Sequence, residues 1–169
     1  RKVELFSKNF DVLKNRFNRL RRLPSFETPC NTRNAAGGVP WKKVFPFDEY
    51  KRNRRNSFAS HTPAVDANHV YTIWQSTRGS ILVAMDHDGK KTWEFELGGF
   101  SGGHGPATSP IVHDNLVIIC NDQEGKNGES FLVAVDAESG KLRWKIDRAS
   151  DRACYSTPCI YQQTGKPDM

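Results

Sequence analysis

The sequence lacks the short motifs that indicate a particular enzyme or binding site. It has no glycine-rich nucleotide loop, no zincin motif, no Gly-x-Ser-x-Gly elbow and no Cys-x-x-Cys pair. No stretch approaches the ~18 consecutive apolar residues that a membrane-spanning helix needs. These absences argue against several enzyme and metal-binding classes, and they leave no catalytic and no metal-binding residue to predict from motifs.

Cysteine is scarce, with four residues in a chain of 169. Cys120 follows Val-Ile-Ile, and Cys159 lies within Thr-Pro-Cys-Ile, so both have apolar neighbours. A free cysteine often behaves as a small buried hydrophobe. We therefore expect Cys120 and Cys159 to be core thiols, while the sequence leaves the redox state of all four cysteines open.

Negative charge is scarce at the N-terminal end. Residues 1–56 contain 15 Lys and Arg against 5 Asp and Glu, whereas residues 57–169 contain 10 against 14. A basic end of this kind is typical of a segment that meets nucleic acid, anionic lipid or an acidic partner, and equally of a solvated face. We expect no nucleic-acid partner, and contact with a membrane stays open.

The basic end itself predicts an amphipathic helix over residues 3–23. Apolar residues recur there at helical spacing among lysines and arginines. Pro24 ends the pattern, and the Pro-, Gly- and Asn-rich residues 24–40 predict a loop. We expect the helix to pack on the rest of the protein, and binding to an anionic surface is the alternative. The apolar stripe consists of Phe6, Phe10, Leu13, Phe17 and Leu20.

What the sequence does contain is a repeat. A glycine, three spacer residues and a tryptophan occur three times, and the tryptophans Trp41, Trp93 and Trp144 lie 52 and 51 residues apart. A second phrase, Ser/Thr-Pro followed by apolar residues, recurs with its prolines 47 and 48 residues apart. Two independent phrases with one shared period are typical of solenoids, propellers and arrays.

Each repeat predicts four short strands separated by turn residues such as Asp-Asn and Asp-Gly. Residues 41–47 are expected to be the lone final strand of a preceding unit, and residues 155–161 to open a third one. The strands expected in the two complete units are 62–66, 70–74, 81–86 and 91–97, then 110–113, 116–121, 130–136 and 141–147.

Four antiparallel strands in roughly 50 residues make one blade of a β-propeller. We therefore expect an all-β protein, a partial β-propeller of four-stranded antiparallel blades, preceded by the basic amphipathic helix. Propellers typically close with about 4–8 blades. Because two complete blades cannot close a ring, we also expect the chain to be a fragment of a longer protein.

The repeat resembles that of a known family. Residues 134–144, Ala-Val-Asp-Ala-Glu-Ser-Gly-Lys-Leu-Arg-Trp, resemble the Ala-x-Asp-x-x-Thr-Gly-x-x-x-Trp docking repeat of pyrroloquinoline quinone (PQQ) type β-propellers, with Ser139 in place of Thr. Residues 84–93 match with a turn one residue shorter. The resemblance, which covers residues 56–161, is to PQQ-like propeller proteins related to the outer-membrane β-barrel assembly lipoprotein. It implies that these residues dock one blade on the next: Trp41, Trp93, Trp144, Gly89, Gly140, Ala84, Asp86, Ala134 and Asp136.

The chain is thereby divided into four parts. Residues 1–33 are expected to be the basic helix and a linker outside the repeat, and residues 34–55 the end of a preceding blade with a connecting loop. Residues 56–161 are expected to hold about two blades and the start of a third, and residues 162–169 a truncated end.

The residues leave the function open between two classes. Every recurring residue has a packing explanation, which favours a non-catalytic scaffold that binds a protein or peptide and needs no cofactor. The resemblance implies an alternative, a fragment of a PQQ-dependent dehydrogenase with PQQ and calcium as cofactors. The resemblance also implies a periplasmic or cell-envelope location.

Calcium takes about 6–8 oxygen ligands, and the one cluster of candidate ligands in the sequence is Asn121-Asp122-Gln123-Glu124. Because the cluster follows a predicted strand, we expect it to be a solvated turn. The adjacent cysteine pair common in such dehydrogenases is absent from the sequence.

Overall fold

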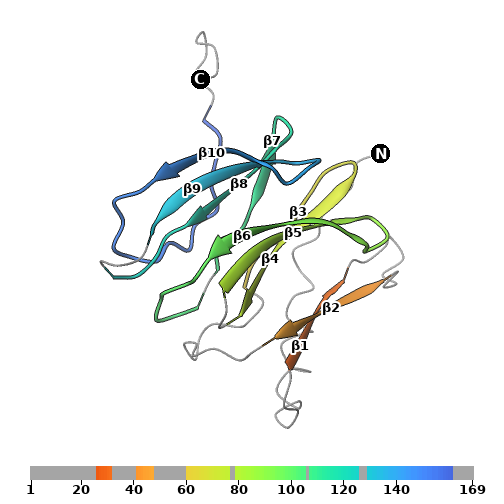
Figure 1. Ribbon diagram of the computed structural model, residues 1–169, viewed down its shortest axis with the longest axis horizontal. Coiled ribbons are helices and arrows are strands. Elements are labelled where there is room, and N and C mark those ends of the chain that lie inside the picture. Colours follow the sequence, from red (N-terminus) through yellow and green to blue (C-terminus); the bar gives the residue numbers. More distant parts are fainter. Residues whose placement is uncertain are drawn as a thin grey trace.

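A computed structural model describes residues 26–31, 41–47, 60–76, 79–105, 107–125 and 129–161. These residues form three antiparallel sheets that follow one another along the chain (Figure 1). The expected all-β fold is confirmed, whereas the expected helix at residues 3–23 lies outside the described residues. Within the described part of the chain, no helix is long and apolar enough to cross a membrane.

Two of the sheets are four-stranded meanders, the form of a propeller blade, and they confirm the partial propeller. We call them the first and the second blade. The first blade has the order β3-β4-β5-β6, with β3 Ala64–Val65, β4 His69–Ser76, β5 Gly79–Asp86 and β6 Lys91–Gly98. The second has the order β10-β9-β8-β7, with β7 Ile111–His113, β8 Leu116–Asn121, β9 Phe131–Asp136 and β10 Leu142–Asp147.

The predicted turns join these strands for identifiable reasons. Asp114 and Asn115, between β7 and β8, have φ angles of 46° and 61°. Aspartate and asparagine tolerate this left-handed region, and two such residues in a row match the twist of a two-residue hairpin. Between β3 and β4, Asp66 Oδ1 accepts hydrogen bonds from the backbone amides of Asn68 and His69, at 2.8 and 2.7 Å.

The sheet at the N-terminal side corrects the sequence prediction. Strand β2, Lys42–Phe47, is not alone, because β1, Phe26–Asn31, pairs with it antiparallel. The prediction of a loop over residues 24–40 was therefore wrong for β1. The loop was predicted from the proline, glycine and asparagine content of residues 24–40. Among the described residues, however, each strand of this two-stranded sheet has a free edge, and a proline such as Pro29 is tolerated there.

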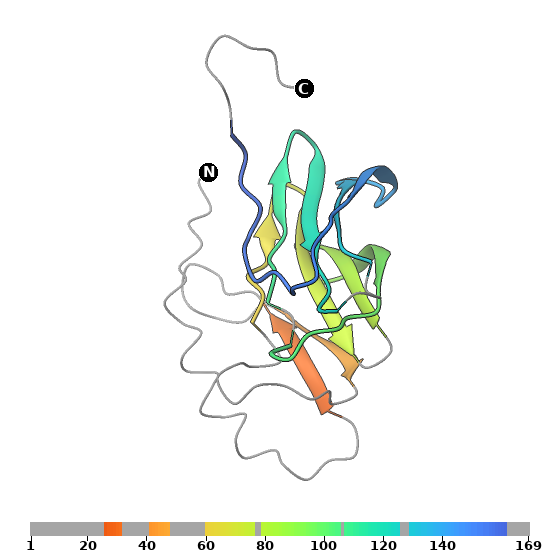
Figure 2. The same cartoon turned by 90° about the vertical axis from the view of Figure 1, so that its left-hand side faces the viewer.

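The segment after the second blade also differs from expectation. Residues 155–161 form no strand, since no described neighbour pairs with them. Figure 2 shows the segment that follows β10 returning to the side where β3 and β7 lie. Cys159, expected in the core, is exposed because this segment is uncovered, whereas Cys120 is buried as expected.

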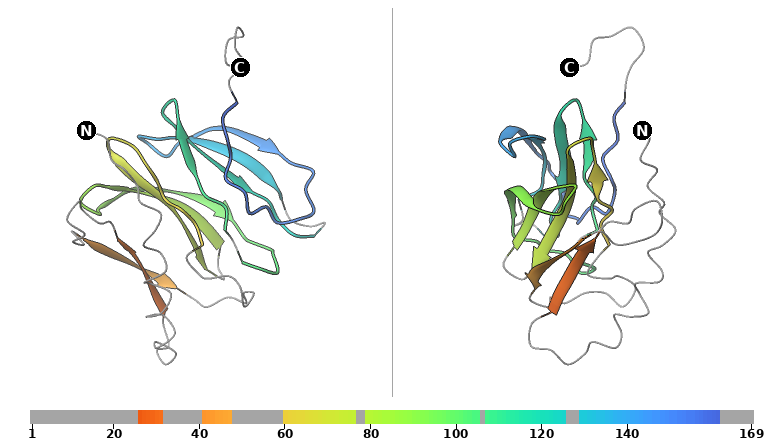
Figure 3. Two further views of the ribbon diagram at one scale, coloured as in Figure 1. Left: turned by 180° about the vertical axis from the view of Figure 1, so that it is seen from behind. Right: turned by 90° about the vertical axis from the view of Figure 1, so that its right-hand side faces the viewer.

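The core lies between the two blades. Strand β5 alternates, so that Leu82 and Ala84 face the second blade while Val83 and Met85 face the opposite way, and all four are fully buried. Trp41 packs on the Val83 side. The first blade is therefore covered on one face by the β1–β2 sheet with Trp41 and on the other by the second blade (Figures 1 and 3).

Candidate functional site

The candidate site is the interface between the blades, because most of the recurring sequence residues meet there. At its outer side, Trp93 Nε1 donates a hydrogen bond to the carbonyl oxygen of Ala137 at 3.0 Å, and Trp93 is only 9% exposed. Gly140 lies under the indole with φ +70°, and a Cβ atom there would come within 2.6 Å of the ring. The turn can accept the tryptophan only because it carries no side chain at this position.

The same contact occurs one repeat earlier. Trp41 Nε1 donates to the carbonyl oxygen of His87 at 2.7 Å. Gly89, with φ +81°, lies against the indole, and a Cβ atom there would approach to 2.5 Å. Trp144 is the exception, since it is half-buried and meets no such turn in the described part of the chain.

The alanines of the repeat lie opposite the tryptophans, and the aspartates hold the two turns. Ala84 pairs directly opposite Trp93, and Ala134 directly opposite Trp144. Asp136 Oδ1 accepts hydrogen bonds from the Ser139 amide and hydroxyl at 2.9 and 2.8 Å, and these bonds lower the pKa of the carboxyl. The Asp86 carboxylate likewise accepts from two amides of its own turn, those of Asp88 and Lys90.

Tyr71 adds a polar contact that the sequence did not predict. Its ring lies 5.8 Å from that of Trp93, between centroids. Its single proton is donated to Asp66 Oδ2 at 2.6 Å, and the Ala137 carbonyl oxygen, at 3.2 Å, is a more distant acceptor. Burial, followed by this bond to Asp66, raises the pKa of Tyr71 well above its usual value.

The pKa of the Asp66 carboxyl shifts in the opposite direction. Burial would raise the pKa of its carboxyl, but the hydrogen bonds from Tyr71 and from the Asn68 and His69 amides outweigh burial and lower it. The charged form of Asp66 therefore stabilises the folded state.

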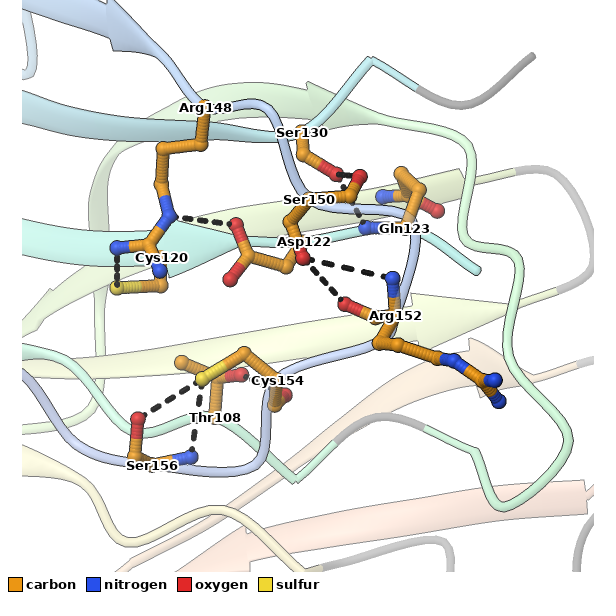
Figure 4. A network of polar contacts seen from close by, with 10 residues as sticks. All are labelled: Thr108, Cys120, Asp122, Gln123, Ser130, Arg148, Ser150, Arg152, Cys154 and Ser156. Atoms are coloured by element: carbon orange, nitrogen blue, oxygen red, sulfur yellow. Dashed lines mark hydrogen bonds and ion pairs between the residues drawn. The ribbon is translucent and has the colours of Figure 1, made fainter. Parts of the chain in front are cut away.

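A second row of contacts joins successive repeats at the Ser/Thr-Pro phrases. The Thr62 amide donates to Ser109 Oγ at 2.9 Å, and Thr108 Oγ1 donates to the carbonyl oxygen of Cys154 at 2.9 Å (Figure 4). His61 Nδ1 lies 2.6 Å from the carbonyl oxygen of Thr108. The repeat of this phrase in the sequence thus marks the points where neighbouring repeats are joined.

The cluster 121–124 was expected to be a solvated turn, and this is correct only for Glu124, which is exposed. Asn121, Asp122 and Gln123 are buried, with 7%, 3% and 4% exposure. The Asn121 and Gln123 side-chain amides donate to backbone carbonyl oxygens of residues 97 and 99, in the strand end and loop that leave the first blade. The strand-end position suggested solvent, but the glycine-rich connection covers these side chains.

Asp122 pairs with a cation rather than with a metal. Its Oδ1 lies 3.0 Å from Arg148 Nε, and its side chain is 1% exposed (Figure 4). Arg148 Nη1 also lies 3.9 Å from Cys120 Sγ, a thiol whose pKa burial raises. No group of three or more His, Cys, Asp or Glu side chains in the described ranges is placed to hold a metal ion.

The comparison by sequence identifies one family. The family described as outer membrane protein assembly factor BamB matches residues 32–160. No curated protein matches the sequence.

The solved structures that resemble this chain belong to larger proteins. A europium-containing methanol dehydrogenase matches with a TM-score of 0.50 and 14% identity, over 75% of this chain and 23% of that one. A quinohemoprotein alcohol dehydrogenase of Comamonas testosteroni matches with a TM-score of 0.45 and 21% identity, over 66% of this chain and 17% of that one. The quinohemoprotein alcohol dehydrogenase ADHIIG of Pseudomonas putida HK5 matches with a TM-score of 0.42 and 24% identity, over 50% of this chain and 12% of that one. The chain thus spans less than a quarter of each of these proteins.

Replacing Gly140 by alanine should destabilise the protein more than replacing Gly98. Both glycines have positive φ angles, +70° and +84°, so alanine costs about 1–2 kcal/mol of backbone strain at either position. Only the Gly140 Cβ meets the Trp93 indole, whereas nothing lies within 4 Å at Gly98. Overpacking should therefore add about 1–3 kcal/mol for Gly140→Ala. Urea unfolding of both variants measures the difference, and equal losses would contradict the contact.

Tyr71→Phe should reduce the amount of stability that the protein loses when the pH falls into the acid range. Because the pKa of Asp66 is lowered from 3.8 in the folded state, its contribution is fully present above that value and disappears as pH falls through the folded pKa. Removing the Tyr71 donor reduces this contribution. The wild type should be more stable than Tyr71→Phe at neutral pH, and this gap should shrink in acid. Tyr161→Phe, at an 84% exposed position, is the control. A gap independent of pH would refute the assignment.

Proposed function

The chain belongs to the family described as outer membrane protein assembly factor BamB, and from this membership we infer that it supplies two consecutive blades of a larger PQQ-type β-propeller. The observation that carries the proposal is the repeated contact, Trp41 on the Gly89 turn and Trp93 on the Gly140 turn. Identical contacts at successive interfaces are what a ring of similar blades requires.

In this proposal the repeat residues dock blades. The tryptophan of each blade binds the turn of the next, the alanine opposite it leaves space for the indole, and the aspartate holds the receiving turn in shape. Residues 56–161 would be the propeller part of the chain, with residues 1–33 outside it. Trp144 would be covered by a following blade.

The activity of the whole propeller is a separate proposal with two candidates. The fold shared with the methanol dehydrogenase supports a quinoprotein dehydrogenase at least as well as the non-catalytic scaffold, which the comparisons do not confirm. We therefore place the dehydrogenase first. The description of the family favours the second candidate, a scaffold with protein partners in outer-membrane assembly. Both candidates imply a periplasmic or cell-envelope location.

The described residues do not fit the calcium and PQQ of such a dehydrogenase. The Asn121 and Gln123 amides are bound to backbone groups, and Asp122 is paired with Arg148. A calcium ion would have to displace an arginine and break these bonds. In a dehydrogenase these two blades would form part of the wall, and the cofactor ligands would come from other blades.

Trp93→Ala should cost about 3–5 kcal/mol of stability, as for other buried tryptophans. Trp144→Ala should cost clearly less in this chain, because Trp144 is half-buried. In a longer form that includes the following blade, the two losses should become similar. Urea unfolding of both variants in both forms tests the docking role, and a Trp144 loss that stays small in the longer form would contradict it.

Calorimetric titration with PQQ in the presence of calcium separates the two candidate activities. This chain alone should bind no PQQ, because its described side chains offer no site for the calcium. A longer form should bind PQQ one to one if the protein is a dehydrogenase. Absence of binding to the longer form would rule out the dehydrogenase and favour the scaffold. It would not affect the proposed blade contacts.

A further inference from the structure

A small cavity, partly open to solvent, lies between the two blades. Its volume is about 20 Å³, and residues of both blades line it. Strand β5 contributes Ser80, which lies on the same face as Leu82 and Ala84, the face that packs against the second blade. The second blade contributes Asp122, at the end of β8.

Ser80 is a buried donor without an acceptor. The residue is 3% exposed, and its Oγ has no hydrogen-bond partner among the described residues. An unpaired buried hydroxyl destabilises a protein, and native structures seldom keep one. A partner for Ser80 Oγ is therefore expected inside the cavity that the residue lines.

Asp122, which also lines this cavity, has a buried acceptor. Its Oδ1 lies 3.0 Å from Arg148 Nε, yet the two groups are not aligned for a hydrogen bond, and this oxygen makes none within the described residues. The ion pair with Arg148 balances the charge of the Asp122 carboxylate, but Oδ1 still lacks a hydrogen bond. A donor in the cavity would supply that hydrogen bond.

His61 supplies a second acceptor. Its Nδ1 lies 2.6 Å from the Thr108 carbonyl oxygen, and a carbonyl oxygen can only accept, so Nδ1 carries the proton. Burial lowers the pKa of His61, which keeps the ring neutral near pH 7. Nε2 of this cavity-lining residue then has a lone pair and no proton.

The cavity therefore needs an occupant that both donates and accepts. A cation is disfavoured by Arg148 beside Asp122, and an anion by the carboxylate itself. A buried water needs about 10–15 Å³ and 2–4 polar partners, and the cavity has room for one such molecule.

We propose that a single water molecule is bound between the blades, accepting a hydrogen bond from Ser80 Oγ and donating to Asp122 Oδ1 and His61 Nε2. This water joins β5 of the first blade, and the segment before β3, to the end of β8 in the second. Direct side-chain contacts do not provide this link between the blades.

The test is a count of long-lived internal waters by water-¹⁷O magnetic relaxation dispersion, combined with a high-resolution crystal structure. The wild-type crystal should show one water within hydrogen-bond distance of Ser80 Oγ and Asp122 Oδ1. Ser80→Ala should keep the water but shorten its residence time about fivefold, the equivalent of one neutral hydrogen bond. Ser80→Val should fill the cavity and remove one long-lived water from the count.

Ser156→Ala is the control, since Ser156 is exposed and bonds to Cys154 away from the cavity. It should leave the count and the residence time unchanged. A wild-type crystal in which Ser80 Oγ donates to a protein carbonyl, with no density in the cavity, would overturn the proposal. An unchanged count in folded Ser80→Val would overturn it as well.

Discussion

The arrangement of the blades depends on one contact, the indole of a tryptophan lying on the glycine of a turn one repeat later in the chain. A buried tryptophan removes about 150–250 Å² from water, which is worth about 4–6 kcal/mol at roughly 25 cal/mol per Å². The indole also has one N–H group, and at both interfaces a turn carbonyl oxygen accepts it. Apolar area thus supplies the energy, and the hydrogen bond fixes the position of the ring.

Around this contact the interface is more polar than a simple apolar core. Tyr71 and Asp66 lie beside Trp93, and the Ser/Thr-Pro phrases contribute His61, Thr108 and Ser109 on another row. A buried polar group stabilises a fold only when its partners are present, and misaligned blades would lose several of these bonds together. The polar rows therefore select one register between blades that the apolar residues alone would leave less well defined.

The sequence predicted the blades because turn residues and apolar runs recur in every repeat. Strand β8 was predicted with its observed bounds, and most other strands to within one or two residues. Strand β1 was missed because Pro29 is compatible with a strand only at a free edge, which the sequence does not reveal. The burial of Asn121 and Gln123 was missed for a related reason, since their partners are backbone carbonyls at the end of β6 and in the loop after it, more than 20 residues away. Tyr71 carried no repeated signal, whereas the Ser/Thr-Pro phrase did.

The direction of the indole contact has a consequence for biosynthesis. The acceptor carbonyls lie 46 and 44 residues downstream of Trp41 and Trp93. Because a chain emerges from the ribosome N-terminus first, each blade leaves the exit tunnel with its tryptophan uncovered until the next turn has been synthesised. Each docking indole therefore stays without its receiving turn until the following repeat has been made.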